Sequence, residues 1–218
     1  MAMESQGVRI LKAAATVSTL TTTLNVSATR VNWPNVAGDF PGAGFTTAMW
    51  VALSNSTELH PVKAVAATRV DIHGTWETTG SAGKELTGYT MGLIGEITDF
   101  TGPGGAAAVI DITHVQSTAK EKMIGIRDEG QLSMSLNFNA TDTGQVGLIA
   151  DRAARTSGKY VIQLTDVASG SSAFPSYAAF NGYPLQYSIS GAVDNKVSAN
   201  AVIEIDGSVD WATAVRNA

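Results

Sequence analysis

The chain contains no cysteine among its 218 residues, and this absence removes several kinds of chemistry at once. Disulfide bonds, thiolate metal sites and a cysteine nucleophile are all excluded. The chain is nevertheless long enough to bury the core of one domain, with or without a sizeable insertion. We therefore expect the fold to be held by packing and hydrogen bonding alone.

Charged residues are also scarce. They make up 15% of the sequence, against a usual share of about a quarter. The net charge of −5 weighs against wrapping or sequence-specific contact with nucleic acid, which requires clustered Lys and Arg on the phosphates. A protein with so few charges either associates by design or owes its solubility to Ser, Thr and Asn, and we favour association.

Long apolar runs are missing as well. The longest are short pieces such as Met49 to Leu53, far below the ~20 residues of a transmembrane helix. Near the N-terminus, Glu4 precedes Arg9 and a Thr-rich stretch follows where a signal peptide would be apolar. We therefore expect no membrane contact and a protein that stays in the cytoplasm where it is made.

What is present is alternation of apolar and polar residues. It is strict from Gln131 to Phe138 and predicts a strand with one wet face. A second strand is predicted from Tyr183 to Ile189, with Tyr183, Leu185, Tyr187 and Ile189 on one side and with Pro184 indicating an edge or a strand start. A third follows from Val197 to Ile205, and the turn Gly191 to Lys196 makes these two a hairpin.

The polar faces of these strands contain no Lys or Arg. If such faces line a channel, the wall is neutral to anionic, and DNA slides along it because no counterion-releasing contacts hold the phosphates. The candidate lumen-facing residues are Gln131, Ser133, Ser135, Asn137, Ser198, Asn200, Glu204 and Asp206.

One helix is predicted from Asp142 to Ser157, with Thr141 or Asp142 as N-cap and Gly158 as the C-terminal stop. Its apolar stripe consists of Val146, Ile149, Ala150 and Ala153. Residues 13–88 differ in composition, being rich in Thr, Ala and Gly. We interpret them as a small β-rich insertion, and assign residues 1–12 and 89–218 to the main domain.

The segment His114 to Glu129 is long for a hairpin loop, and long loops in compact domains are commonly functional. It presents apolar groups between charges of both signs, which suits docking onto a neighbouring subunit. An Ω-loop folded back on its own sheet is the alternative. The candidate contact residues are Lys120, Lys122, Met123, Ile124, Ile126 and Arg127.

Signals for catalysis or metal binding are weak. Ser117 and Lys120 have the S-x-x-K spacing of some acyl-transfer enzymes, but the companion motifs are missing. Asp111 and His114 are too few to form a zinc site. The glycine-rich run Thr101 to Gly105 lacks the lysine and helix of a phosphate-binding loop. We therefore predict no catalytic, cofactor-binding or metal site and no enzyme.

Several strings occur in an order and spacing that resemble one family. They are Ser5 to Val8, Gly95 to Gly105, Ile110 to His114, Ser117 to Lys122, Asp128 to Phe138, Phe180 to Tyr183, Ser188 to Asp194 and Ile203 to Trp211. Together they resemble the lambda-type siphophage major tail tube protein over residues 1–12 and 89–213. Compact members of that family lack the 13–88 insertion.

The resemblance implies a mainly β fold, an antiparallel β-sandwich or barrel-forming sheet with one flanking α-helix. It implies six copies per ring, stacked rings in a virion tail, and a long loop at 114–129 that contacts the next ring. DNA would pass through the lumen without specific binding, and tape-measure, tail-terminator and tail-tip proteins would be partners. The insertion would lie on the outer wall. An Ig-like adhesin or receptor-binding module is the alternative from a different class.

Overall fold

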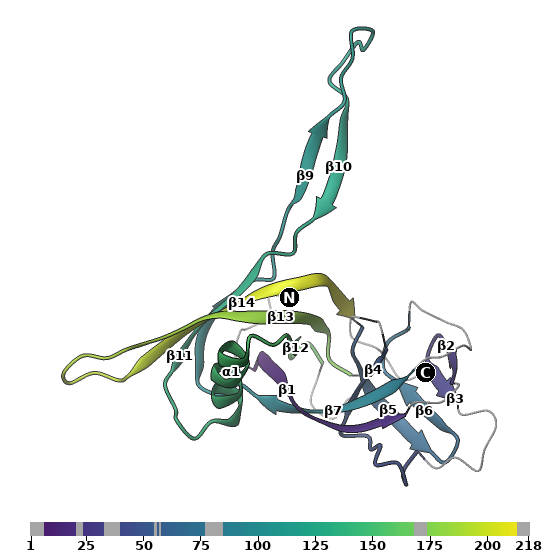
Figure 1. Ribbon diagram of the computed structural model, residues 1–218, viewed down its shortest axis with the longest axis vertical. Coiled ribbons are helices and arrows are strands. Elements are labelled where there is room, and N and C mark those ends of the chain that lie inside the picture. Colours follow the sequence, from purple (N-terminus) through teal and green to yellow (C-terminus); the bar gives the residue numbers. More distant parts are fainter. Residues whose placement is uncertain are drawn as a thin grey trace.

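The computed structural model describes residues 7–20, 24–32, 40–54, 56, 58–76, 85–167 and 174–212. Over these residues the chain is mainly β and carries one helix, α1 (Thr143–Ala154), which confirms the predicted fold class (Figure 1). The strands are β1 (Arg9–Leu20), β2 (Asn25–Ser27), β3 (Arg30–Asn32), β4 (Trp50–Leu53), β5 (His60–Ala66), β6 (Arg69–Ile72), β7 (Leu86–Leu93), β8 (Ile97–Thr101), β9 (Ala107–Asp111), β10 (Lys122–Arg127), β11 (Gln131–Asn137), β12 (Gly158–Gln163), β13 (Tyr177–Ser190) and β14 (Ser198–Ala212).

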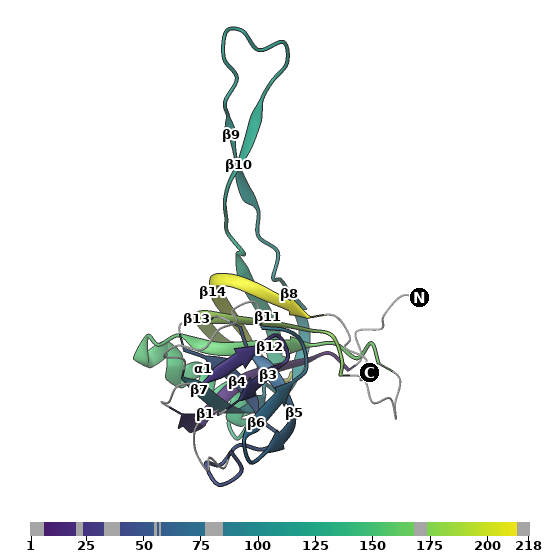
Figure 2. The same cartoon turned by 90° about the vertical axis from the view of Figure 1, so that its right-hand side faces the viewer.

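Twelve strands form one antiparallel sheet in the order β2-β3-β6-β5-β4-β7-β1-β12-β13-β14-β11-β8. The sheet curls, and α1 lies against its inner side (Figures 1 and 2). Residues from β1, β11, β12, β13 and β14 meet Leu148 of the helix in the main hydrophobic core. The remaining strands, β9 and β10, pair with each other and with no other strand of the described ranges.

The two strands with the clearest alternation fold as predicted. Leu132, Met134 and Leu136 of β11 are buried, and they face Ala199, Ala201 and Ile203 across the ladder with β14. Sequence alternation determines these strands because one face is buried and the side-chain period of a strand is two.

The alternation predicted for β13 is wrong in its first half. Tyr183 and Leu185 are exposed, whereas Pro184 is buried opposite Ile203. The cause is a register shift between Pro184 and Gln186, which moves the side chains before it to the other face. Pro184 also lies two residues beyond Gly182, the last residue of β13 that pairs with β12, so its missing N–H falls where that ladder has ended.

The helix begins as predicted, because Asp142 is the N-cap and its side chain accepts a hydrogen bond from the Gln145 N–H at 2.8 Å. It ends earlier than predicted: Arg155 takes the left-handed conformation at the C-cap, and Gly158 already belongs to β12. The predicted apolar stripe is also wrong, since Val146 and Ile149 are exposed. The buried helix residues are Gly144, Gln145 and Leu148.

A second core lies in the part of the sheet formed by β2 to β6 and the start of β7. It contains buried side chains such as Phe40, Val51, Val70 and Trp76. A third, smaller cluster joins this part to the main core, where Trp50 of β4 meets Tyr177 of β13 with ring centroids 5.0 Å apart. Long β1 pairs with both β7 and β12, so the sheet is continuous across the junction.

Candidate assembly surfaces

Strands β9 and β10 form a two-stranded hairpin, called the arm below, that projects away from the body (Figures 1 and 2). The segment predicted as a loop over 114–129 therefore contains a strand, and its alternative as an Ω-loop folded back on the sheet is wrong. Neither strand makes an extensive contact with another described element. An isolated hairpin of this kind is at best marginally stable in water, so the arm requires a partner surface.

Large apolar side chains of the arm are exposed. Ile124 is 75% exposed and Ile126 is 94% exposed, although isoleucine is among the residues most often buried in proteins. The predicted contact residues Met123, Ile124 and Ile126 therefore all lie open on one projecting element, together with exposed Lys120, Lys122 and Arg127. Contiguous apolar surface on a projecting element marks an interaction site.

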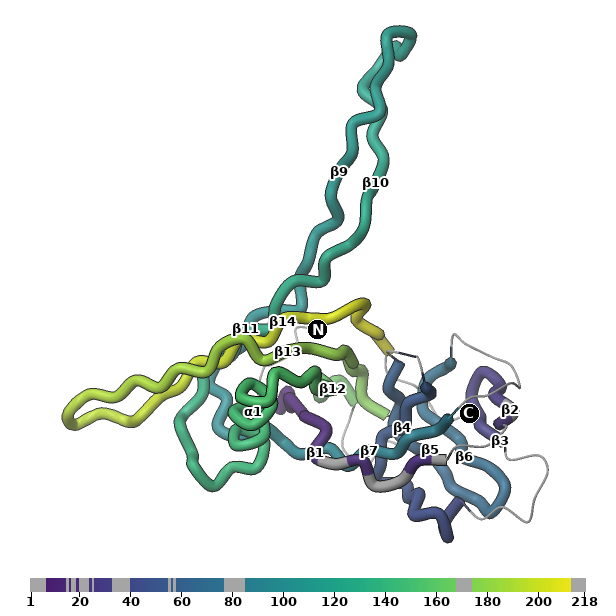
Figure 3. Tube along the Cα trace, viewed as in Figure 1, coloured from purple at the N-terminus to yellow at the C-terminus, as the bar shows by residue number. Residues whose placement is uncertain are grey.

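The root of the arm is tightly built. A Cβ placed on Gly105 would lie 1.4 Å from the carbonyl oxygen of Asp128, so only glycine fits between the two legs. The Asp128 side chain accepts a hydrogen bond from the Gly130 N–H at 2.9 Å, and the Ile205 N–H donates to the Gly130 carbonyl at 3.0 Å. These contacts tie the arm to β14, and Figure 3 shows both legs leaving the body side by side.

At the far end of the arm, Ser117 Oγ lies 2.6 Å from His114 Nδ1, and Glu121 lies 3.6 Å from the same nitrogen. A serine–histidine–carboxylate relay needs the serine and the carboxylate on opposite ring nitrogens. Here both meet Nδ1, and the imidazole is largely exposed. The cluster therefore stabilises a turn, and Lys120, the other residue of the S-x-x-K spacing, is itself exposed.

Polar side chains cover the outer face of β8, β11, β14 and the second half of β13, called the polar face below. Gln131 donates to Glu204 at 2.6 Å across the β11–β14 ladder, and Ser135 donates to Asn200 at 3.0 Å. The structure thus brings seven of the eight predicted lumen residues into paired cross-strand positions, namely Gln131, Ser133, Ser135, Asn137, Ser198, Asn200 and Glu204. Asp206 is exposed further along β14, opposite Asn181 of β13.

The polar face also contains residues that sequence reasoning missed. Asp99 and Thr101 of β8 lie opposite Ser135 and Ser133. The signal was weak because Thr98 interrupts the alternation and the register shifts beside Ser135. The four strands β8, β11, β13 and β14 contain no Lys or Arg. Strand β8 adds the carboxylate of Asp99 to those of β14.

Among the residues that the structure describes, this four-stranded segment has two unpaired edges. Strand β8 pairs with β11 on one side only. On β13, pairing with β12 stops at Gly182, and beyond it the ladder partner is β14 alone. Arg152 of the helix donates to the Leu185 carbonyl at 3.2 Å, which leaves residues 186–190 as the open stretch. Open edges are templates for pairing with another chain.

A buried polar cluster lies at the junction of the cores. His60 Nδ1 is 2.8 Å from the Tyr177 hydroxyl, and His60 Nε2 is 3.5 Å from Glu58. Burial, together with the nearby carboxylates of Asp210 and Glu58, raises the pKa of Tyr177. Within the described residues no group of three His, Cys, Asp or Glu side chains is arranged to hold a metal ion, and no helix is long and apolar enough to cross a membrane.

The fold combines a curled antiparallel sheet with open edges, an uncharged to acidic polar face and a projecting apolar arm. These features are typical of a structural protein that associates through its surfaces. The sequence model of the family described as "Phage tail tube, TTP, lambda-like" matches residues 81–215, and the chain belongs to this family of structural tail tube proteins. The matched range includes α1, the arm and every strand from β7 to β14. Family membership implies self-assembly into a tube within a virion tail. A comparison with curated proteins found no match.

Proposed function

We propose that this chain forms hexameric rings that stack into a tube and that the tube conducts phage DNA. The observation that carries the proposal is the four-stranded segment β13-β14-β11-β8, which has two open edges and a polar face without Lys or Arg. A segment open at both ends can join copies of itself head to tail, and such contacts close into a ring when the rotation allows.

Strand direction supports this closure. Each strand of the segment is antiparallel to its neighbour, so β13 and β8, at the two ends, run in opposite directions. Copies related by rotation about a tube axis keep their strand directions, so β8 of one copy meets residues 186–190 of the next in antiparallel pairing. The four-stranded segments would then form one closed ladder around the ring, in which neither β8 nor residues 186–190 is left as an exposed edge.

The polar face would line the lumen of this ring, with Gln131, Ser133, Ser135, Asn137, Ser198, Asn200, Glu204 and Asp206 toward the DNA. Phosphates would meet hydroxyl, amide and carboxylate groups there. Because binding to DNA gains free energy mainly from Lys and Arg contacts that release counterions, this wall would let DNA slide.

The arm would stack the rings. Its exposed apolar residues would be buried against the next ring, and its charges of both signs would fix the register. The contact residues in this proposal are Lys120, Lys122, Met123, Ile124, Ile126 and Arg127. Residues 13–88 would form an insertion on the outer wall, because an insertion in the lumen would block it. Tape-measure, tail-terminator and tail-tip proteins would be the other partners, and assembly would take place in the host cytoplasm.

Electron microscopy tests the proposal directly. The purified protein, concentrated and imaged in negative stain, is expected to form hollow rings and stacked tubes with sixfold symmetry in end-on views. A protein that stays monomeric at every concentration, even when seeded with phage tails, would contradict it.

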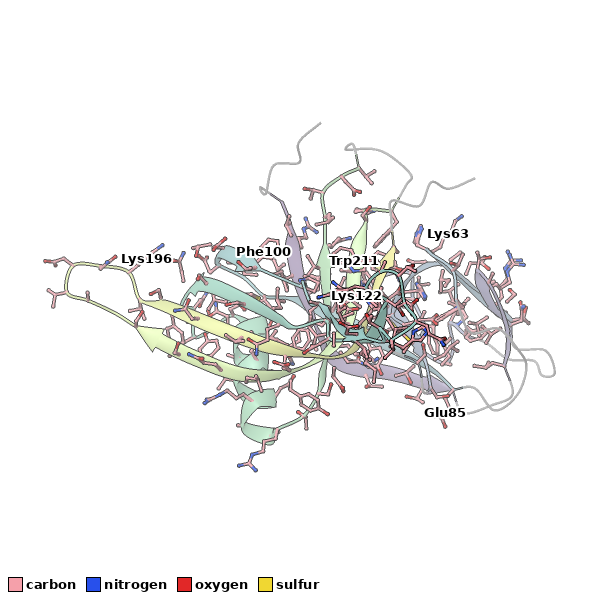
Figure 4. All side chains as sticks on the ribbon, turned by 90° about the horizontal axis from the view of Figure 1, so that it is seen from above. Lys63, Glu85, Phe100, Lys122, Lys196 and Trp211 are labelled. Carbon is pink, nitrogen blue, oxygen red and sulfur yellow. The ribbon has the colours of Figure 1, made fainter. Side chains whose placement is uncertain are left out.

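The lumen assignment needs a separate test. Asp206→Lys places a cation on each copy of the proposed wall, and we expect normal tubes but slower DNA ejection. Glu85→Lys is the matched control, because Glu85 is exposed at the opposite end of the molecule from the β13–β14 turn (Figure 4). Equal ejection rates for the two variants would remove residue 206 from the lumen.

A further inference from the structure

The register of the arm places apolar residues on both of its faces. Val109 lies opposite Ile124, and the next pair along the ladder is Ile110 opposite Met123. Because successive residues of a strand point to opposite sides, these two pairs lie on opposite faces. We call the Val109–Ile124 pair the valine face and the Ile110–Met123 pair the methionine face.

The two faces differ in shape. The valine face carries the more exposed pair, and on the same side Asp111 and Lys122 stand opposite each other. The methionine face projects less toward the root, because Gly125 has no side chain and Ala108 has only a methyl group there. The side chains of Ala108 and Ile110 lie close beside Gly125, since a Cβ on Gly125 would be 3.5 Å from Ala108 Cβ and from Ile110 Cδ1. The two faces therefore differ in surface shape, and neither packs on the described part of the body of its own chain.

One flat partner surface cannot bury both faces. It would cover one pair and leave the other in water, and each apolar side chain left exposed forgoes the stabilisation that burial gives. A ribbon covered on both sides needs packing layers about 10 Å away on each side. The recess between α1 and β1, lined by Lys12, Gly92 and Val146, holds about 340 Å³, which suits single side chains and not a ribbon.

The boundary between two neighbouring copies provides two surfaces, one from each copy. We propose that each arm is inserted between two neighbouring copies of this chain and buries its valine face against one and its methionine face against the other. The inference rests on the ring stacking proposed above and specifies its partners. Family membership makes copies of this chain the occupants, because they assemble into a tube.

Two-wall burial has a consequence for assembly. An arm held between two copies of the next ring contacts both of them and holds them together, so stacking also stabilises ring closure. Docking on a single copy would stack rings without strengthening their lateral contacts.

Photocrosslinking distinguishes the two arrangements. A benzophenone amino acid is placed at Ile124, at Met123, or at both, and a small fraction of the modified chain is assembled with excess wild type. Each single probe is expected to yield a two-chain product, and the double probe a three-chain product. A probe at exposed Lys63 is the control and is expected to yield no arm-dependent product.

If tubes form but the double probe gives only two-chain products, each arm touches one copy and this inference is wrong while the proposed function stands. If a modified chain does not enter the tubes, Ile124→Ser and Met123→Ser replace the probes. Each is expected to raise the critical concentration for tube formation about tenfold or more. An effect from only one of the two substitutions would overturn two-sided burial, and wild-type chain that forms no tubes would overturn the proposed function itself.

Discussion

Strands β10 and β11 are neighbours in the chain and both contain large apolar residues, but these residues are exposed in one strand and buried in the other. In β11 the side chains of Leu132 and Met134 are at most 1% exposed, whereas in β10 those of Met123 and Ile124 are at least half exposed. The difference lies in the neighbours: β11 lies between β8 and β14, and β10 has only β9. Apolar residues in β11 therefore stabilise the monomer, and those in the arm are available to stabilise an assembly.

The largest expected effect follows from removing the arm. Residues 107–127 would be replaced by a short Asn-Gly turn at Ala106 and Asp128, whose backbones already approach within hydrogen-bonding distance. We expect a folded, soluble monomer with a cooperative urea unfolding transition like that of the wild-type monomer, and no tubes by sedimentation and microscopy. Tubes formed without the arm would show that the arm is not the stacking element.

Matched truncations in the two regions give the next largest effect. Leu132→Ala removes buried methyl groups from the core, and we expect it to lower the free energy of unfolding by about 2–5 kcal/mol. Ile126→Ala, in the arm, should change it by less than about 0.5 kcal/mol because the side chain is already in water. Urea unfolding of the monomer measures both, and similar losses would mean that the arm is part of the folded core.

The same contrast explains what could be predicted from the sequence. The strands around Leu132 and Ile203 were predictable because one face is buried, so that polarity alternates with the side-chain period. The strand at Lys122–Arg127 was predicted as part of a loop, since apolar residues on both of its faces produce no alternation. Its contact role was inferred nevertheless, because apolar residues between charges favour docking in either conformation.

The helix was harder, since its buried face depends on residues far away in the sequence. Gln145 is buried because its amide donates to the carbonyls of Gly95 and Asn137, and its oxygen accepts from the Asn139 N–H and the Tyr187 hydroxyl. A polar residue satisfied in this way does not contribute to an apolar stripe. Sequence periodicity therefore selected the wrong face.

The buried amide of Gln145 tests whether the body depends on buried polar contacts, since contacts of the arm such as that of Ser117 with His114 are exposed. Gln145→Leu leaves two carbonyls, an N–H and a hydroxyl without this partner, and we expect a loss of roughly 1–3 kcal/mol in unfolding free energy. Gln186→Leu is the control, because Gln186 is exposed on the polar face. Equal urea midpoints for the two variants would contradict the role of the buried amide.

The smallest expected effect is a pH dependence that arises in the body and not in the arm. Burial first, and then the charge of Lys63, lower the pKa of His73. Its ring stacks on Phe174 with centroids 4.8 Å apart. Its Nδ1 is buried and has no hydrogen-bond partner among the described residues, which favours the neutral form.

Because the folded pKa of His73 lies below the unfolded value of about 6.5, its contribution to stability is present above that pH and is lost as pH falls through the folded pKa. His73→Phe should therefore reduce the fall in urea midpoint between neutral and mildly acidic pH, and Lys63→Gln should reduce it less. His114→Asn, in the exposed arm, should leave the midpoint of the monomer unchanged at both pH values. If His114→Asn reduced the pH dependence and His73→Phe did not, the proton-sensitive part of the molecule would be the arm, and the division between a self-sufficient body and a partner-dependent arm would be wrong.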